Sequence, residues 1–211
     1  MILTVDIGNT TVCVCGVENL GLGGHAAIFC TRLETVPGKD AAAYEAELRE
    51  ALDQAGVGVE RIQGAVVSSV VPCLNDPIRT CIRAVLGKEP VWITVQSRTG
   101  LTMAVDYPEK VGVDRIVDAA WVAANCPLPA VTVDMGTATT FNVIGEGGVF
   151  LGGAISVGMA TGLKALVAKT AQLPPLRLDA VDTVIGKNTE ACMESGAVIG
   201  GAAMIDGLGA R

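Results

Sequence analysis

The chain opens with a short apolar run that leads into Val5-Asp6-Ile7-Gly8-Asn9-Thr10-Thr11, and this segment carries most of the information about the architecture. Its Gly8-Asn9 pair predicts a tight turn that joins strands at residues 2–6 and 11–17. A second segment, Val133-Asp134-Met135-Gly136-Thr137-Ala138-Thr139, repeats the order of strand, Asp-x-Gly, hydroxyl-rich turn and strand. A repeat at so long a spacing is not a solenoid unit, and it indicates a duplicated lobe.

Hydrophobic periodicity predicts the elements around these two segments. Apolar residues at helical spacing predict helices at residues 40–55, 74–86, 114–125, 158–170 and 189–208. Strands are predicted at residues 26–33, 65–71, 91–95, 101–105, 130–137, 139–144 and 149–155. Strands followed by helices, twice over, predict an α/β protein of two similar lobes. We place the N-terminal lobe at residues 1–116 and the C-terminal lobe at residues 117–211.

Composition excludes some classes of function. The 211 residues hold 15 Lys and Arg against 22 Asp and Glu, a net charge of −7, so the chain lacks the clustered cations that a nucleic-acid surface needs. Half of the residues are hydrophobic, which is enough for a buried core and excludes disorder as the dominant state. Nucleotide binding stays open, because a few backbone amides and a metal ion suffice for it.

The cysteines and the N-terminus bear on the cellular compartment. Seven cysteines form no CxxC motif and are odd in number, so we expect reduced thiols in a cytoplasmic protein rather than a disulfide framework or a zinc cluster. Cys13 and Cys15 alternate on one face of a predicted strand, where core packing is the leading interpretation. The single histidine, His25, lies in a predicted Gly-rich turn, which disfavours a histidine-based triad or metal centre. We expect neither a signal peptide nor a membrane-spanning segment.

Each Asp-x-Gly segment is a candidate site for phosphate and a metal ion. The aspartate places a carboxylate at a strand end, the glycine lets the backbone approach an anion closely, and the threonine hydroxyls add donors. A carboxylate also suits a hard cation such as Mg²⁺, which bridges phosphate oxygens. A single copy more often marks only a turn. Two copies in matching strand contexts favour a nucleoside triphosphate site.

A third candidate precedes the predicted central helix, in Val111-Gly112-Val113-Asp114-Arg115. Asp114 has a structural interpretation as the N-cap of that helix. In the functional interpretation, Arg115 supplies a planar pair of donors for a substrate carboxylate, and Asp114 accepts a proton from an attacking hydroxyl. A carboxylate is a weak base toward an alcohol, but a loose phosphoryl-transfer transition state needs little proton removal beforehand.

With these segments in view, the sequence resembles the type III pantothenate kinases of the acetate kinase, sugar kinase, Hsp70 and actin superfamily. Six blocks carry the resemblance along nearly the whole chain, and the Gly-x-Asp-Arg and Gly-Lys-Asn-Thr blocks distinguish this family within the superfamily. The blocks are Asp6-Ile7-Gly8-Asn9-Thr10, Ser68-Ser69-Val70-Val71-Pro72, Gly112-Val113-Asp114-Arg115, Asp134-Met135-Gly136-Thr137-Ala138-Thr139-Thr140, Gly152-Gly153-Ala154-Ile155 and Ile185-Gly186-Lys187-Asn188-Thr189.

The resemblance implies two ribonuclease H-like lobes, as in actin-like ATPases, that are related by duplication. It implies transfer of the γ-phosphoryl group of ATP to the primary hydroxyl of pantothenate, which gives 4'-phosphopantothenate in the first step of coenzyme A biosynthesis. Mg²⁺ and a monovalent cation, K⁺ or NH₄⁺, would be required. The enzyme would be a homodimer with its sites at the interface.

The resemblance also assigns roles to residues. Asp114 would be the general base, Asp6 would lie near the metal-bound nucleotide, and Asp134 would hold the monovalent cation, although the residues by themselves favour Mg²⁺ at Asp134. ATP would contact Thr137 and the first phosphate loop, which consists of Asp6, Ile7, Gly8, Asn9, Thr10, Thr11, Val12 and Cys13. Pantothenate would contact Gly112, Val113, Asp114, Arg115 and, from the neighbouring subunit, Thr189.

Two departures from the family are visible. The family usually has a tyrosine three residues before the proline that precedes Gly-x-Asp-Arg; Val105 takes that place here, and Tyr107 is the candidate substitute. Relatives also continue for a few tens of residues past Arg211, through a Gly-Gly segment that embraces the adenosine, so we expect a truncated C-terminal lobe. The alternative functions are therefore a truncated or regulatory non-catalytic relative, and a superfamily kinase acting on a sugar or short acid.

Overall fold

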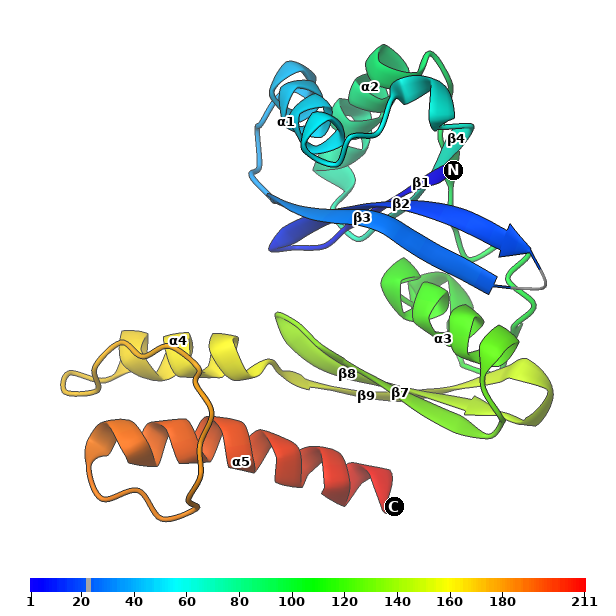
Figure 1. The fold of residues 1–211 in the computed structure, drawn as a ribbon. Coiled ribbons are helices and arrows are strands. Elements are labelled where there is room, and N and C mark those ends of the chain that lie inside the picture. Colours follow the sequence, from blue (N-terminus) through cyan, green and yellow to red (C-terminus); the bar gives the residue numbers. More distant parts are fainter. Residues whose placement is uncertain (22–23) are drawn as a thin grey trace. The chain divides into compact units, whose positions relative to one another are not determined.

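The computed structural model describes residues 1–21 and 24–211, and these divide into two compact units. The first unit consists of Met1–Thr99 and Tyr107–Val117, and the second consists of Gly100–Asp106 and Asp118–Arg211. Each unit has its own sheet (Figure 1), so the chain is a mixed α/β protein with two sheets, as predicted. The lobe boundary at residue 116 stays a prediction.

The sheet of the first unit has five strands in the order β3-β2-β1-β4-β5. β1 (Ile2–Ile7), β2 (Thr11–Gly21) and β3 (Gly24–Glu34) form an antiparallel meander, which confirms the turn predicted between the first two strands. β4 (Gly64–Ser69) pairs in parallel with β1, and β5 (Val91–Trp92) pairs in parallel with β4. Because β1 and β4 are parallel neighbours, their carboxyl ends meet at the same edge of the sheet.

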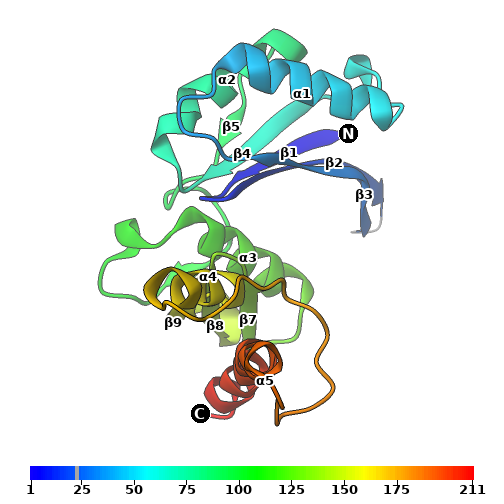
Figure 2. The ribbon, with the colours of Figure 1, turned by 90° about the vertical axis from the view of Figure 1, so that its left-hand side faces the viewer.

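One face of this sheet carries the core of the first unit. Side chains alternate along β1, so that Leu3, Val5 and Ile7 are buried while Thr4 and Asp6 lie on the other face. α1 (Ala41–Gln54) and α2 (Asn75–Leu86) lie side by side over the buried face (Figure 2). Burying one such aliphatic side chain stabilises a fold by roughly 1.5–3 kcal/mol, so this layer holds the unit together.

The helices of the first unit begin and end close to the predicted residues. Asp40 is the N-cap of α1 and accepts a hydrogen bond from the Ala43 N–H over 2.8 Å. Short 3-10 helices span Val59–Arg61 and Pro72–Leu74, and the second of these leads into α2. α2 ends at Gly87, whose left-handed φ of 65° suits glycine because it has no Cβ.

β5 is shorter than the strand predicted at residues 91–95. The Ile93 N–H still donates to the Val67 carbonyl over 2.8 Å, but the chain then turns. The Thr94 N–H donates to Ser97 Oγ over 2.9 Å, and the Ser97 N–H donates back to the Thr94 carbonyl over 3.0 Å. These local bonds replace the ladder, because serine and threonine side chains compete for backbone groups.

The expectation that all thiols are reduced is wrong for one pair. Cys15 of β2 and Cys30 of β3 form a disulfide, and their Cα atoms lie 4.1 Å apart because the two residues stand opposite each other in the antiparallel register. The cysteine count does not reveal this pair, since a disulfide depends on which strands become neighbours. His25 also differs from the prediction, because it lies in β3 and not in a turn.

The sheet of the second unit has four strands in the order β6-β9-β8-β7. β7 (Ala130–Met135), β8 (Ala138–Gly145) and β9 (Val149–Val157) form a second antiparallel meander, and the short β6 (Thr102–Met103) runs parallel to β9. Inside this sheet Asn142 is fully buried and donates to Thr132 Oγ1 over 2.9 Å, as a buried amide requires. The strands predicted at residues 139–144 and 149–155 are confirmed, whereas those predicted at 101–105 and 130–137 are shorter in the structure.

The remaining helices also match the periodicity. They are α3 (Val113–Asn125), α4 (Met159–Lys169) and α5 (Thr189–Gly209), with 3-10 turns at Pro108–Lys110 and Glu146–Gly148. α4 packs beside α5, and a long irregular segment joins them (Figure 1). Asn188 is the N-cap of α5 and accepts the Ala191 N–H over 2.8 Å. In the described part of the chain, every helix is too short or too polar to cross a bilayer.

Candidate phosphate and substrate sites

The β1–β2 turn is held in shape from two sides. The Gly8 N–H donates to the Thr11 carbonyl over 3.0 Å and closes the turn. Thr35, which follows β3, donates its hydroxyl to the Gly8 carbonyl over 2.7 Å and its backbone N–H to the Thr10 carbonyl over 3.2 Å. Asn9 and Thr10 are exposed, so the turn presents polar groups to solvent on a fixed base.

Asp6 lies near the carboxyl end of β1, and its side chain is exposed on the face away from the core. Ser68 stands beside it in the parallel register and donates its hydroxyl to Asp6 Oδ1 over 2.6 Å. The next residue, Ser69, donates to Asn75 Oδ1 over 2.7 Å and accepts the Val71 N–H over 3.2 Å. A carboxylate and two oriented hydroxyls therefore lie at the edge where β1 and β4 end.

The other residues of the predicted first phosphate loop lie on different faces of the first sheet. Ile7 and Val12 are buried in the core, so their side chains are not available to a ligand. Cys13 stands opposite Asp6 in the antiparallel register of β1 and β2, which places both side chains on the same face. The structure therefore brings Asp6, Ser68 and Cys13 together on three adjacent strands.

The predicted pantothenate residues Gly112, Val113, Asp114 and Arg115 lie at the start of α3, in the first unit. Asp114 lies within the first turn of the helix and not at the predicted N-cap, and its Oδ1 accepts the Arg115 N–H over 2.8 Å. A Cβ atom on Gly112 would collide with that oxygen, so glycine leaves room for the carboxylate. An acid in the first turn is also stabilised by the helix dipole.

The β7–β8 turn of the second unit rests on the start of α4. The Gly158 N–H and the Thr161 hydroxyl both donate to the Thr137 carbonyl, over 3.1 Å and 2.8 Å. A Cβ atom on Gly158 would overlap the Gly136 carbonyl oxygen, so this close approach requires glycine. Gly158 is the N-cap of α4, and no side chain caps the helix there. The turn therefore lies beside a helix N-terminus, where anions bind readily.

Asp134 is exposed near the end of β7. It borders a cavity of about 270 Å³ within the second unit, whose other lining residues are Asp118, Trp121, Val122, Thr132 and Val133. Two carboxylates and a hydroxyl are oxygen donors of the kind that hard cations take. Across the residues that the structure describes, no three or more His, Cys, Asp or Glu side chains are grouped to hold a metal ion on their own.

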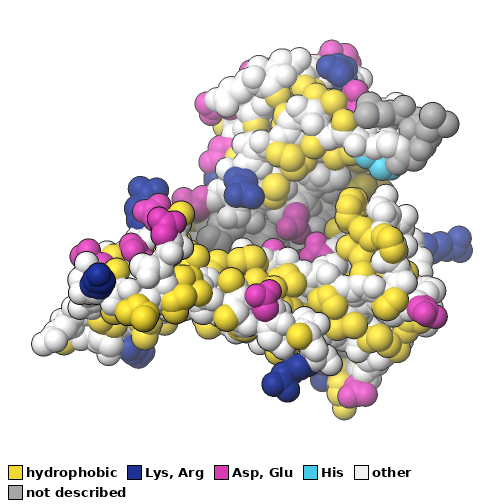
Figure 3. Space-filling model, turned by 60° about the horizontal axis from the view of Figure 1, so that its bottom comes forward, with side chains coloured by type: hydrophobic (Ala, Val, Ile, Leu, Met, Phe, Trp, Pro, Cys, Tyr) yellow, Lys and Arg dark blue, Asp and Glu magenta, His cyan; other side chains and the backbone are white. Residues whose placement is uncertain are grey.

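A larger groove of about 990 Å³ lies in the second unit, along α4 and α5. Leu163, Leu166 and Met193 give it an apolar lining, to which Thr189 and Lys187 add polar groups. Hydrophobic side chains are also spread over the face of this unit that Figure 3 shows. The predicted pantothenate residue Thr189 is therefore an exposed lining residue of this groove.

Val105 and Tyr107 belong to different units. Val105 lies near Gly152 of β9, because a Cβ atom placed on that glycine would be 3.6 Å from Val105 Cγ1. Tyr107 is 60% exposed, and the Lys110 ammonium lies over its ring at 4.3 Å from the centroid. The role of either side chain toward pantothenate stays a prediction.

Sequence reasoning missed the residues that support the two turns. Nothing in the sequence marks Thr35, because its contact with Gly8 depends on β3 returning alongside β2. Gly158 and Thr161 were predicted only as part of a helix. A glycine that directly precedes a helix and follows a strand was the one available signal for a close backbone approach.

These features define a class of protein. On a mixed α/β fold, two turns that contain glycine and threonine each follow a strand-end aspartate, and a third aspartate opens a helix. An enzyme that holds a phosphorylated substrate and its cation needs carboxylates, hydroxyls and glycines that let the backbone come close to the phosphate. Residues of these types at these positions are typical of a small-molecule kinase.

The chain belongs to the type III pantothenate kinase family, whose family model matches residues 2–211. It is 38% identical over 208 residues to the type III pantothenate kinase of Moorella thermoacetica, covering 99% of this chain and 80% of that protein. It is 37% identical over 206 residues to that of Finegoldia magna, covering 98% of this chain and 77% of that protein. The resemblance inferred from the sequence blocks is confirmed.

The fold also resembles a solved structure. A conserved putative Baf family transcriptional activator from Campylobacter jejuni matches with a TM-score of 0.54 and 19% identity, covering 98% of this chain and 78% of that one. At that identity the similarity concerns the fold alone.

Proposed function

We propose that this chain catalyses the ATP-dependent phosphorylation of the primary hydroxyl of pantothenate to 4'-phosphopantothenate, the first step of coenzyme A biosynthesis. The observation that carries the proposal is the Asp6–Ser68 pair beside the β1–β2 turn, in a chain of the pantothenate kinase family.

The β1–β2 turn binds the phosphates of ATP in this proposal. The hydroxyls of Thr10 and Thr11 and the exposed backbone at Asn9 and Thr10 supply the donors, and the residues from Gly8 to Cys13 form the loop that presents them. Asp6 would hold Mg²⁺ that arrives with the nucleotide, which fits an exposed carboxylate, because Mg²⁺ is usually bound by one or two carboxylates and the substrate phosphates. When bound, Mg²⁺ neutralises charge that develops on the transferred group.

The β7–β8 turn contributes Thr137 to ATP binding. The support is its position on the uncapped N-terminus of α4, which favours an anion. Asp134 would hold the monovalent cation, K⁺ or NH₄⁺, with Asp118 and Thr132 as further oxygen donors in the same cavity. Such a cation would supply positive charge beside the phosphates.

Asp114 is the general base in this proposal, and Arg115 binds the carboxylate of pantothenate. The Arg115 N–H fixes one oxygen of the Asp114 carboxylate, and Gly112 leaves space for it. A positioned carboxylate accepts the hydroxyl proton as the phosphoryl group transfers, and such a base accelerates a reaction by about 10²–10⁴-fold. Gly112 and Val113 complete this part of the pantothenate site.

The rest of the pantothenate site comes from Val105, Tyr107 and Thr189, with Thr189 supplied by the neighbouring subunit of a homodimer. The support for Thr189 is its exposure on the lining of the 990 Å³ groove of the second unit. A cytoplasmic location follows from the place of the reaction in metabolism. The two antiparallel meanders support lobes of the ribonuclease H-like type that arose by duplication.

The test is an assay of ADP release with ATP, Mg²⁺, K⁺ and pantothenate. We expect pantothenate-dependent turnover, and we expect Asp114→Asn to lower it by about 10²–10⁴-fold while calorimetric ATP binding is retained. Asp53→Asn, an exposed change at the end of α1, is the matched control and should be neutral. Asp114→Asn with full activity would contradict the mechanism.

The outcomes separate the alternative functions. ATP-independent pantothenate binding without ADP release would favour a regulatory, non-catalytic relative. Turnover that requires a sugar or a short acid in place of pantothenate would favour another kinase of the superfamily.

A further inference from the structure

We propose that Cys13, Cys15 and Cys30 form a thiol–disulfide exchange site, whose redox state controls how firmly the β1–β2 turn is held. The three residues are called the sulfur cluster below. The functional half of this inference rests on the proposed function, because that function makes the turn the ATP phosphate site. The chemical half does not depend on it.

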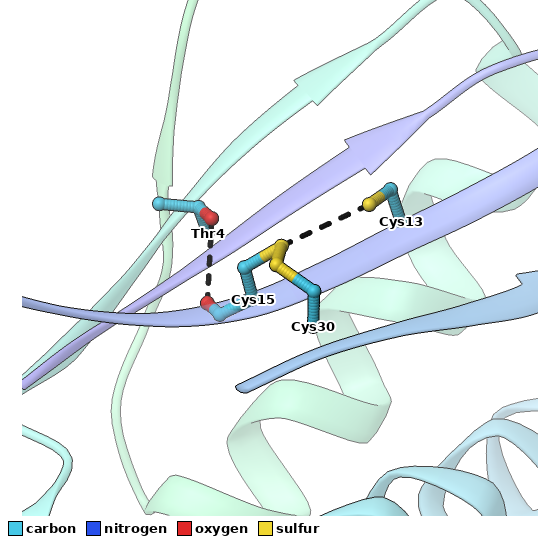
Figure 4. The surroundings of a disulfide bond; sticks show 4 residues. All are labelled: Thr4, Cys13, Cys15 and Cys30. Atoms are coloured by element: carbon cyan, nitrogen blue, oxygen red, sulfur yellow. Dashed lines mark hydrogen bonds between the residues drawn. A yellow bond between two sulfur atoms is a disulfide. The ribbon is translucent and has the colours of Figure 1, made fainter. Parts of the chain in front are cut away.

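The sulfur cluster lies on one face of the β2–β3 hairpin (Figure 4). Cys15 and Cys30 are bonded across the two strands, and the Cys13 Sγ lies 3.8 Å from the Cys15 Sγ. Cys13 and Cys15 are two residues apart on β2, so their side chains point to the same face. Exchange proceeds when a thiolate attacks a disulfide sulfur, and in the reaction below a small reagent supplies that thiolate.

The disulfide is accessible to small reagents. β3 is the edge strand of the first sheet, and Cys30 is exposed there. Cys13 and Cys15 are half-buried. Cys81, by contrast, is buried in the core, where burial raises the pKa of its thiol to about 12 and keeps it unreactive. The sulfur cluster therefore differs from an inert structural cysteine.

The reaction is a two-electron reduction by a low-molecular-weight dithiol. One thiolate of the dithiol attacks the Cys30 Sγ, the Cys15–Cys30 bond breaks, and Cys15 leaves as a thiolate that takes up a proton. This gives a mixed disulfide between the reagent and Cys30. The second thiol of the reagent then attacks the reagent's sulfur in that mixed disulfide, and Cys30 is released as a thiol. Two electrons and two protons pass to the protein, and the dithiol becomes a cyclic disulfide.

The β2–β3 hairpin connects this reaction to the phosphate turn. The register runs from Cys15 opposite Cys30 to Thr11 opposite Glu34, and the next residue is Thr35. Thr35 makes the two hydrogen bonds that hold the β1–β2 turn. A register shift directly follows the disulfide, between Gly16 and Val17. The disulfide ties β3 to β2 on this path, in addition to the ladder and to Phe29 and Leu33, which pack against the core. Its loss would let Thr35 move more and would weaken both bonds.

The proposed cytoplasmic location bears on whether this disulfide is permanent. Disulfides in a reducing cytoplasm are usually transient, and they serve catalysis or redox sensing. Under the proposed cytoplasmic location, the reduced and oxidised forms of the sulfur cluster would both be populated as the thiol pool changes. A reduced cluster would then weaken ATP binding.

The first test counts thiols. The chain has seven cysteines, and five are free in the structure. Alkylation of the purified protein in denaturant should label five thiols before dithiothreitol and seven after it, and peptide mapping should join Cys15 to Cys30. Dithiothreitol should convert the native protein to the seven-thiol form without unfolding it. Seven labelled thiols in protein oxidised with a mild disulfide oxidant would overturn the exchange site.

The second test compares kinetics of the oxidised and reduced protein. Reduction should raise the KM for ATP by about three- to tenfold, the effect of weakening one or two hydrogen bonds, with a smaller change in kcat. Cys30→Ser should show the higher KM in both conditions, and the control Cys126→Ser should respond like the wild type. An active kinase whose KM ignores dithiothreitol would overturn the inference, whereas a lack of pantothenate-dependent activity in both forms would overturn the proposed function instead.

Discussion

Ser68 donates its hydroxyl to Asp6 Oδ1 over 2.6 Å, although the two residues are 62 positions apart in the sequence. They meet because β4 pairs in parallel with β1, which places them side by side at the end of both strands. The bond fixes one oxygen of the carboxylate and leaves it oriented at the sheet edge, where the nucleotide-bound cation is proposed to lie.

Ser68→Ala should remove the hydrogen bond that orients the Asp6 carboxylate and should leave its charge in place. We expect kcat/KM for ATP to fall by about 10- to 150-fold, because one hydrogen bond to a charged group is lost. Steady-state kinetics with ATP varied at saturating Mg²⁺ measures the effect. Ser97→Ala, which removes a hydroxyl from the turn after β5, is the control and should leave kcat/KM unchanged.

Gly112→Ala should displace the Asp114 carboxylate. A Cβ at residue 112 would collide with Asp114 Oδ1, and the end of that side chain would have to move. Misplacing a catalytic group lowers turnover by about 10–100-fold, so kcat should fall by that factor while the urea midpoint changes little. Gly64→Ala, where a Cβ meets open space, should keep its activity. Normal kcat in Gly112→Ala would count against Asp114 as the base.

Gly158→Ala should destabilise the second unit. The added Cβ would overlap the Gly136 carbonyl and lie 2.6 Å from the Thr137 carbonyl oxygen, and backbone cannot yield as a side chain does. We expect a loss of about 1–3 kcal/mol in the free energy of unfolding, measured in urea. Gly207→Ala in α5 meets no atom within 4 Å and should instead stabilise by about 0.5–1 kcal/mol.

Stability should decline in alkali because of Cys81. Burial, aided by the Glu45 carboxylate, raises the pKa of this thiol from 9.0 to about 12. The unfolded chain therefore loses the Cys81 proton at a lower pH than the folded chain does. The contribution of the protonated thiol to the free energy of unfolding is complete below pH 9, and it is lost as the pH rises towards 12. The slope is at most about 1.4 kcal/mol per pH unit. Cys81→Ala should flatten the urea stability curve above pH 9, and Cys126→Ala should not.

The sequence by itself determined the elements and the family. Period-two and period-3.6 patterns are local, so the strands around residues 7–11 and 135–138 and the helix that starts after Asp40 follow from neighbouring residues alone. The motif blocks identified the pantothenate kinase family for the same reason, because each block is a short contiguous segment.

Only the tertiary structure decided which distant residues meet. The Cys15–Cys30 disulfide, the Thr35 contacts with the β1–β2 turn and the Asp6–Ser68 pair all join residues from different strands. Strand order and register set these contacts, and both depend on the packing of whole faces rather than on any short run of residues. A local pattern therefore predicts that a strand exists, but its partner is chosen by the core that the complete unit buries.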